Sequence, residues 1–370
     1  MEHYYEKYYK HHAPSANALL HRTTDRIASI KIPLGSKHPD PEPILALLHD
    51  AGFNGVLLNC ITPGGKLVLD PAGFLALFAE TANKYSIQCG LDIPCAFPGK
   101  TNRTQQTFRK QLRSLLSSGI SFFEIRLNNT EQMGQPEWDP LFSMIRQMQP
   151  DAVISGGPDR RRSNPGGSLP PLSSSRYTPR NCFLNGEAPN NPKSIERHYA
   201  LGNPFNGLYY LQPECDIPLP PTPEQLVEAY MNSAGNGGIM NVRIPMDDHG
   251  MFSTETEELF RSFARRLNAL QSREILSWYL NDGDQLLELY PGSFDLIDLS
   301  EDMSSGERVR AWKIEGKTAD QWQTLAEGTI IGFRRLRLLP EPCRCTLLRL
   351  TVTGGGAELK LYSKVHDHEQ

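Results

Sequence analysis

The stretch IASIKIPLGSKHPDPEPILALLHDAGFNGVLLN, residues 27–59, contains a short β-rich run, an amphipathic run of helical length and a second β-rich run. This order is typical of the strand–helix–strand units that build a parallel sheet. Similar β-rich runs continue along the chain and predict eight strands. They are Ile27–Ile32, Gly55–Asn59, Gln88–Ile93, Phe122–Leu127, Ala152–Ser155, Cys182–Leu184, Gly207–Leu211 and Gly238–Ile244.

Helical periodicity connects most of these strands. The predicted helices are Pro43–Ala51, Pro71–Tyr85, Gln105–Ser118, Pro140–Met148, Pro223–Ser233 and Thr254–Leu270. Two crossovers are weaker: residues 160–180 are rich in Pro, Ser, Gly and Arg, and residues 192–201 allow only a short helix. Eight strands with mostly helical crossovers favour a (β/α)8 TIM-type barrel over an open doubly wound sheet, although periodicity alone does not prove closure.

From about Ser272 onward, the sequence pattern changes to short β-rich runs separated by Gly, Pro and Asp. Examples are Val309–Ile314, Ile330–Leu339 and Thr346–Val352. This pattern predicts a small all-β sandwich. We therefore expect a flexible N-terminal arm at residues 1–25, a barrel at 26–272 and a β-sandwich at 273–370.

Composition narrows the range of partners. The 370 residues are 39% hydrophobic and 22% charged, with a formal net charge of -4, which favours neither nucleic acid nor an anionic membrane surface. No apolar run reaches the length of a membrane-spanning helix, and residues 1–12 do not resemble a signal peptide, so we expect a cytoplasmic protein.

Cysteine and histidine usage gives no sign of a metal or cofactor. The seven cysteines lack CxxC spacing and read as reduced core residues. The N-terminal run HYYEKYYKHH contains His3, His11 and His12, but a disordered aromatic arm that docks on another chain is the preferred interpretation. We expect no bound cofactor, and a protein partner or homo-oligomer is possible.

Three stretches resemble the α-L-fucosidase family of glycoside hydrolases. Residues 149–161, QPDAVISGGPDRR, are similar to the family's Gly-Pro-Asp-x-Arg turn. Glu214-Cys215-Asp216 and residues 234–250, AGNGGIMNVRIPMDDHG, resemble its Glu-Cys-Asp and Gly-Asn-Gly segments. Residues 309–350 look like the discoidin-like sandwich of plant and bacterial members. The resemblance covers residues 26–363 and implies the barrel and sandwich predicted above by counting strands.

The resemblance also implies a retaining mechanism, which needs a carboxylate nucleophile and a carboxylic acid about 5 to 5.5 Å apart. The family's nucleophile follows strand four in a Trp-Phe-Asp-Gly motif, and the matching position here is Asn128. An amide is neutral and a poor nucleophile. Residues 162–167, which match the acid position, contain no carboxylate. Glu214 is interpreted as following strand seven and is the best substitute, with Asp216 beside it; the alternative is a structural carboxylate.

Sugar-binding positions change in the same way. The family's histidine motifs after strands one and two correspond to residues 33–35 and 62–65, which contain no histidine. Candidate substrate-binding residues remain after strands two, five and eight, and most of them have a loop-shaping role as their alternative. They are Asn59, Asp159, Arg161, Asp247 and His249.

The leading hypothesis from the sequence is a catalytically degenerate relative of the α-L-fucosidases that binds a glycan, such as a fucosylated ligand, or a protein. One alternative is an active α-L-fucosidase or related glycosidase with relocated carboxylates at Glu214, Asp216 and Asp247. Another alternative is a structural subunit of a larger assembly.

Overall fold

A computed structural model of the chain describes residues 24–32, 39–59, 73–94, 102–128, 135–155, 164–165, 214–289, 293–302, 308–318 and 320–364. Most of the predicted arm, the predicted strands at 182–184 and 207–211, and both Asp159 and Arg161 lie outside these residues.

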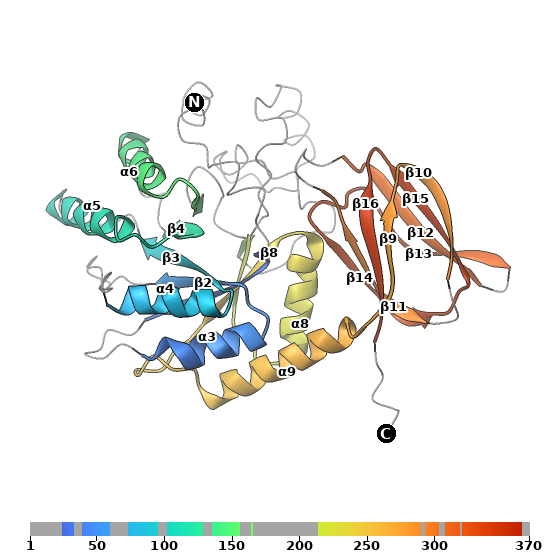
Figure 1. The fold of residues 1–370 in the computed structure, drawn as a ribbon, viewed down its shortest axis with the longest axis horizontal. Coiled ribbons are helices and arrows are strands. Elements are labelled where there is room, and N and C mark those ends of the chain that lie inside the picture. The colour runs from blue at the N-terminus through green and yellow to red at the C-terminus, as the bar shows by residue number, and fades with distance from the viewer. Residues whose placement is uncertain are drawn as a thin grey trace.

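Eight strands form one parallel sheet (Figure 1). They are β1 (Arg26–Lys31), β2 (Gly55–Asn59), β3 (Gln88–Pro94), β4 (Glu124–Asn128), β5 (Val153–Ser155), β6 (Asn164–Pro165), β7 (Glu214–Pro218) and β8 (Ile239–Ile244). Their order is β5-β4-β3-β2-β1-β8-β7-β6, which is the cyclic order of a (β/α)8 barrel. Within the described residues, β5 and β6 are the two ends of this order. The predicted barrel-type fold is confirmed.

Helices cover the outer side of the sheet (Figure 1). They are α3 (Pro41–Asp50), α4 (Phe74–Lys84), α5 (Asn102–Leu116), α6 (Gln135–Met148), α8 (Pro223–Asn232) and α9 (Thr254–Leu270), with a short 3-10 turn η3 (Ala234–Asn236). The six predicted helices are thus confirmed to within a few residues. No described helix has both the length and the apolar content needed to cross a membrane.

Capping residues explain where several helices begin. Asp40 accepts a hydrogen bond from the backbone N–H of Glu42, and Ser253 accepts one from that of Thr256. Thr222 does the same for Gln225. Each cap satisfies one backbone donor that the first helical turn leaves without a partner. Strand positions then alternate: Ala28 and Ile30 pack in the core beneath the helices, while Ile27 faces the barrel interior.

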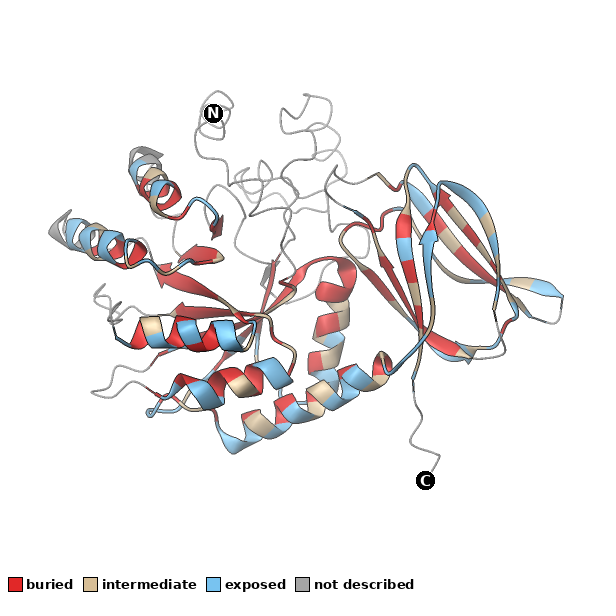
Figure 2. Ribbon diagram, viewed as in Figure 1, coloured by how far each residue is buried: buried red, intermediate tan, exposed pale blue. Residues whose placement is uncertain are grey.

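Two antiparallel sheets follow α9. Their strands are β9 (Arg273–Leu280), β10 (Gly283–Glu288), β11 (Phe294–Ser300), β12 (Ala311–Thr318), β13 (Gln321–Gly328), β14 (Arg335–Cys343), β15 (Leu347–Thr353) and β16 (Ala357–Ser363). The sheet orders are β10-β15-β12-β13 and β14-β11-β16-β9. Residues from both sheets, such as Ile297, Leu350 and Leu359, share one apolar core, so the predicted sandwich is confirmed (Figure 2).

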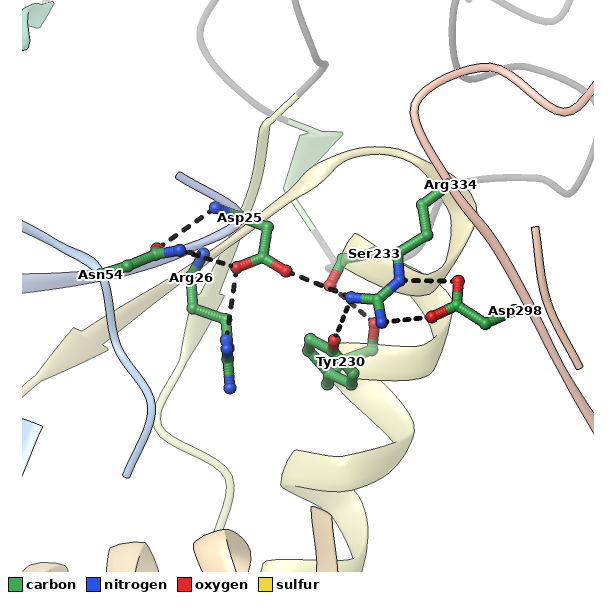
Figure 3. Close-up of polar contacts among 7 residues, drawn as sticks. All are labelled: Asp25, Arg26, Asn54, Tyr230, Ser233, Asp298 and Arg334. Carbon is green, nitrogen blue, oxygen red and sulfur yellow. Dashed lines mark hydrogen bonds and ion pairs between the residues drawn. The ribbon is translucent and has the colours of Figure 1, made fainter. Parts of the chain in front are cut away.

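Arg334 joins the sandwich to the barrel (Figure 3). Its Nε and Nη2 atoms donate to the two carboxylate oxygens of Asp298 at 3.0 and 2.7 Å, and Nη1 donates to the hydroxyl of Tyr230 at 2.7 Å. Nη1 also lies 3.5 Å from Oδ2 of Asp25, directly before β1. Leu296 and Leu336 pack in the same core cluster as the barrel helices, so the junction combines charged and apolar contacts.

Four cysteines lie in the described residues, and all are free thiols. Cys89, Cys215 and Cys345 are buried, and Cys343 is half-buried. Burial raises the pKa of both Cys89 and Cys215 to about 12, because desolvation disfavours the thiolate. These two side chains therefore behave as small apolar core groups.

Candidate ligand site inside the barrel

The interior of the barrel is layered. Ile27, Leu57 and Ile239 meet in a small apolar cluster, with Phe123 packed against it. Because side chains alternate along a strand, the next inward-facing residue of β1 is Ser29 and that of β8 is Asn241. On β1 and β8, polar residues therefore begin one inward-facing position nearer to the carboxyl ends of the strands, which is the end where barrels of this type bind their ligands.

Arg126 on β4 is the centre of this polar layer. Its side chain is 1% exposed and forms ion pairs with two carboxylates, Glu214 on β7 and Asp92 on β3, the latter with Nη1 3.8 Å from Oδ2. Glu214 also accepts a hydrogen bond from Nδ2 of Asn241. Asn241 in turn accepts one from the hydroxyl of Ser29 at 2.8 Å. Strands β1, β3, β4, β7 and β8 thus contribute to one connected network.

Asn128 is the last residue of β4 and is half-buried. Its Nδ2 donates a hydrogen bond to Oδ1 of Asp92. The residue at the expected nucleophile position therefore lies at the carboxyl end of its strand, beside a carboxylate from the neighbouring strand. Its amide carries no charge and cannot form a glycosyl ester by the usual route.

The expected position of Glu214 is wrong. The sequence pattern put it after strand seven, at Gly207–Leu211, but Glu214 is the first residue of β7 and is 2% exposed. In the run ECDIP, Glu214 and Asp216 alternate with Cys215 and Ile217, which is a period of two with the charged residues facing inward. Glu214 therefore lies deep in the barrel, at the register of Ile239, and Asp216 lies one layer nearer the mouth.

Asp216 and Arg243 form a further ion pair, separate from those of Arg126. Nε of Arg243 lies 3.0 Å from Oδ1 of Asp216, whose side chain is only 4% exposed. Arg243 belongs to β8 and lies one inward-facing position beyond Asn241. This pair is therefore nearer to the barrel mouth than the Arg126 network.

Glu124 lies in a deeper layer than Asn128 on the same strand. It is fully buried and accepts a hydrogen bond from the hydroxyl of Ser155 at 2.5 Å. This hydrogen bond is consistent with a side chain that points into the barrel. Glu124 nevertheless lies two inward-facing positions before Asn128, at which β4 ends.

Asp247 shapes the loop after β8. Its carboxylate accepts hydrogen bonds from the backbone N–H groups of His249 at 2.9 Å and Met251 at 2.8 Å. These bonds, first the one from Met251, hold the pKa of Asp247 below its usual value. Asp247 and His249 are both exposed. Among the described residues, no hydrogen bond or ion pair links either of them to the Arg126 network.

Asn59 does lie at the mouth. It ends β2, faces inward and is the register partner of Lys31 on one side and Asp92 on the other. The remaining candidates, Asp159 and Arg161, fall outside the described residues. No group of three or more His, Cys, Asp or Glu residues in the described part of the chain has a metal-binding arrangement.

Sequence reasoning did not identify Asp92, Ser29, Lys31 or Arg243 as candidates. Each lies within a β-rich run, and only the strand register brings them together. The available signal was positional, because each occupies an inward-facing position close to the carboxyl end of its strand.

Comparison with known proteins agrees with this architecture. The fold aligns with a solved structure of a putative α-L-fucosidase from Bacteroides thetaiotaomicron VPI-5482 at a TM-score of 0.75 and 18% identity, covering 95% of this chain and 99% of that one. It also aligns with a GH29 fucosidase from Ruminococcus gnavus in complex with fucose, at a TM-score of 0.71 and 16% identity, covering 97% of each chain. The described structure therefore has the barrel-plus-sandwich fold of the fucosidase structures.

Sequence similarity points in the same direction. A putative α-L-fucosidase 1 from Oryza sativa subsp. japonica is 23% identical over 314 residues, which are 70% of this chain. The match spans 59% of the length of the rice protein. No family model matches the chain. The resemblance of this chain to the α-L-fucosidases is confirmed in both sequence and fold.

Proposed function

We propose that this chain binds a glycan at the mouth of its barrel and does not hydrolyse it. The observation that carries the proposal is the amide of Asn128 at the position that resembles the family's nucleophile. A retaining hydrolase needs an ionised carboxylate there to attack the sugar carbon. Asn128 instead uses its amide as a donor to Asp92.

The other interior carboxylates support this proposal. Asp92 and Glu214 both pair with Arg126, and Asp216 pairs with Arg243. A retaining hydrolase needs its two carboxyl groups on either side of the scissile bond, where they can reach the sugar. These three carboxylates contact guanidinium groups of the barrel instead.

Hydrolysis of an aryl α-L-fucoside over a range of pH tests the loss of catalysis. The wild-type rate should not exceed the rate without protein. Asn128→Asp should not restore turnover, because residues 162–167 supply no acid. A clear wild-type rate that Glu214→Gln abolishes, with the variant still folded by circular dichroism, would contradict the proposal.

A glycosidase with relocated carboxylates is the second candidate, and one observation favours it. Asp92 lies against Asn128, so a carboxylate is present next to the nucleophile position. Asp247 contributes little to this alternative, since its carboxylate is bonded to its own loop. If the fucoside assay shows turnover, Asp92→Asn and Asp216→Asn, each compared with Asp247→Asn, identify the carboxylate that acts.

Glycan-array binding tests the remaining part of the proposal. The Ruminococcus gnavus relative binds fucose, and we expect this chain to show a reproducible sugar preference. A purely structural subunit should show none. A protein partner, a homo-oligomer held by residues 1–25 and a cytoplasmic location stay predictions. Light scattering before and after deletion of those residues tests the homo-oligomer.

A further inference from the structure

Arg243 is the last inward-facing residue of β8. Met240, Val242 and Ile244 pack in the core beneath the helices, so the alternate residues Ile239, Asn241 and Arg243 face the interior. Asn241 is fully buried, whereas the side chain of Arg243 is 55% exposed. The guanidinium therefore lies at the mouth of the barrel, where the strands of such folds present their ligand-binding groups.

A buried carboxylate orients this guanidinium. Nε of Arg243 lies 3.0 Å from Oδ1 of Asp216, whose side chain is 4% exposed. No other hydrogen bond or ion pair of Arg243 occurs with the described residues, so Nη1 and Nη2 remain available. An arginine held in this way can still donate two parallel hydrogen bonds from its Nη1 and Nη2 atoms to carboxylate or sulfate oxygens. Because its side chain is already oriented, it loses less conformational entropy when it binds such a group.

Lys31 adds a second cation to the same rim. It ends β1, the strand beside β8, and lies one inward-facing position beyond Ser29, the register partner of Arg243. Its side chain is exposed, and it forms no ion pair with any described residue. Asp247 and Asp248 lie on the loop that follows β8, and the carboxylate of Asp247 accepts hydrogen bonds from backbone N–H groups of that loop. Arg243 and Lys31 are therefore exposed cations on neighbouring strands of the rim.

We propose that the barrel mouth binds a glycan that carries an anionic group, a carboxylate or a sulfate ester, and that Arg243 binds this group through Nη1 and Nη2. This inference rests on the proposed function and names its ligand class. A neutral sugar offers only hydroxyl groups, which do not compensate an exposed guanidinium as well as a planar or trigonal oxyanion does. Asp216 acts as the positioning residue and Lys31 adds long-range attraction.

Isothermal titration calorimetry at low ionic strength tests this ligand class with four probes: methyl α-L-fucoside, its sulfate ester, methyl β-D-glucuronide and sodium sulfate. The sulfated fucoside or the glucuronide should bind about tenfold tighter than the neutral fucoside, an affinity ratio typical of one charged hydrogen-bonded contact. Arg243→Gln should abolish this ratio, and Lys31→Gln should reduce it. Arg266→Gln is the matched control, since Arg266 is a similarly exposed arginine of α9 that pairs with Glu224.

The outcomes separate the two proposals. If the neutral fucoside binds as tightly as the charged sugars, in wild type and in Arg243→Gln alike, the anionic ligand is wrong and glycan binding stands. If sodium sulfate binds as tightly as the sulfated fucoside, the site recognises the anion alone and both proposals fail. If none of the three sugars binds, both proposals also fail.

Discussion

Two arginines in this molecule each lie between two carboxylates, yet their surroundings differ. At the junction, Arg334 pairs with Asp298 and Asp25, and its three side-chain nitrogens all have partners. In the barrel, Arg126 pairs with Asp92 and Glu214, but its Nε has no hydrogen-bond partner within the described residues. The first cluster is a completed structural contact. The second leaves part of its desolvation cost uncompensated, which favours a functional role over a stabilising one.

Four arginines that form ion pairs can be ranked by the exposed fraction of their side chains. The arginine side chains are 1% exposed at Arg126, 23% at Arg334, 38% at Arg349 and 62% at Arg261. Because a carboxylate left without its counter-charge is destabilised more the less water reaches it, the free energy of unfolding lost on replacing the arginine should fall in this order.

The largest effect is expected at Arg126. Arg126→Met leaves Asp92 and Glu214 without a counter-charge inside the barrel, which should lower the free energy of unfolding by about 3–5 kcal/mol. The control is the triple variant Arg126→Met, Asp92→Asn, Glu214→Gln, in which no charge is stranded and most of the loss should be recovered. Urea denaturation measures both. A loss under about 1 kcal/mol in the single variant would show that the network is open to water.

A smaller loss is expected at the junction. Arg334→Met removes the hydrogen bonds to Asp298 and Tyr230, and charged hydrogen bonds of this kind contribute roughly 1.5–3 kcal/mol each before their mutual dependence is considered. We expect a total of about 2–3 kcal/mol, measured by urea denaturation. If the loss equals that of Arg126→Met, the distinction drawn between the two clusters fails.

Arg349 and Glu315 form an ion pair in the sandwich, with side chains 38% and 9% exposed, and this pair should contribute less to the free energy of unfolding than the Arg334 cluster does. Hydrogen bonds, first from Arg349 and then from Lys313, lower the pKa of Glu315 from 4.5 to about 2. Since the folded pKa is below the unfolded one, the stabilisation is present above about pH 4.5 and is lost as the pH falls toward 2. The difference in melting temperature between wild type and Glu315→Gln should shrink over that range. A constant difference would mean that packing, not charge, is responsible.

The smallest effect is expected at Arg261, which pairs with Glu257 one helical turn away at 3.7 Å. Exposed pairs of this spacing contribute about 0.3–0.5 kcal/mol, so Arg261→Gln should change the free energy of unfolding by no more than that. Added salt should remove even this difference, because the pair is fully accessible to counter-ions. A persistent larger loss in high salt would indicate a contact other than the ion pair.

The sequence predicted the strands with an apolar outer side well, and Gly55–Asn59 is correct at both ends. It failed at Glu214–Pro218, because a strand that turns charged residues into a polar barrel interior has the composition of a loop. Counting apolar residues cannot distinguish such a strand from a loop. The alternation of Glu214 and Asp216 with Cys215 and Ile217 does distinguish them. As a result, Glu214 was expected at the rim of the barrel, whereas it lies inside the barrel.

The candidate site was harder to predict than the fold. The mapping of Asn128 came from the resemblance, and the structure adds that Asp92 contacts it. Contacts such as Arg126 with Glu214 join residues far apart in the chain, and they depend on strand order and register. A single sequence shows which residues alternate along each strand, but it does not show the register between neighbouring strands. The contact partners of each polar residue could therefore not be predicted from it.

The junction at Arg334 determines how this protein can be divided. A barrel produced without its sandwich would expose the packing surface that receives Leu336 and would leave the Asn236 carbonyl without the guanidinium of Arg335 that now donates to it. Asp25, directly before β1, would also lose its ion pair with Arg334 of the sandwich. Truncated forms are therefore poor material for ligand screens, and heating of the intact chain should give a single calorimetric peak in which both halves melt together.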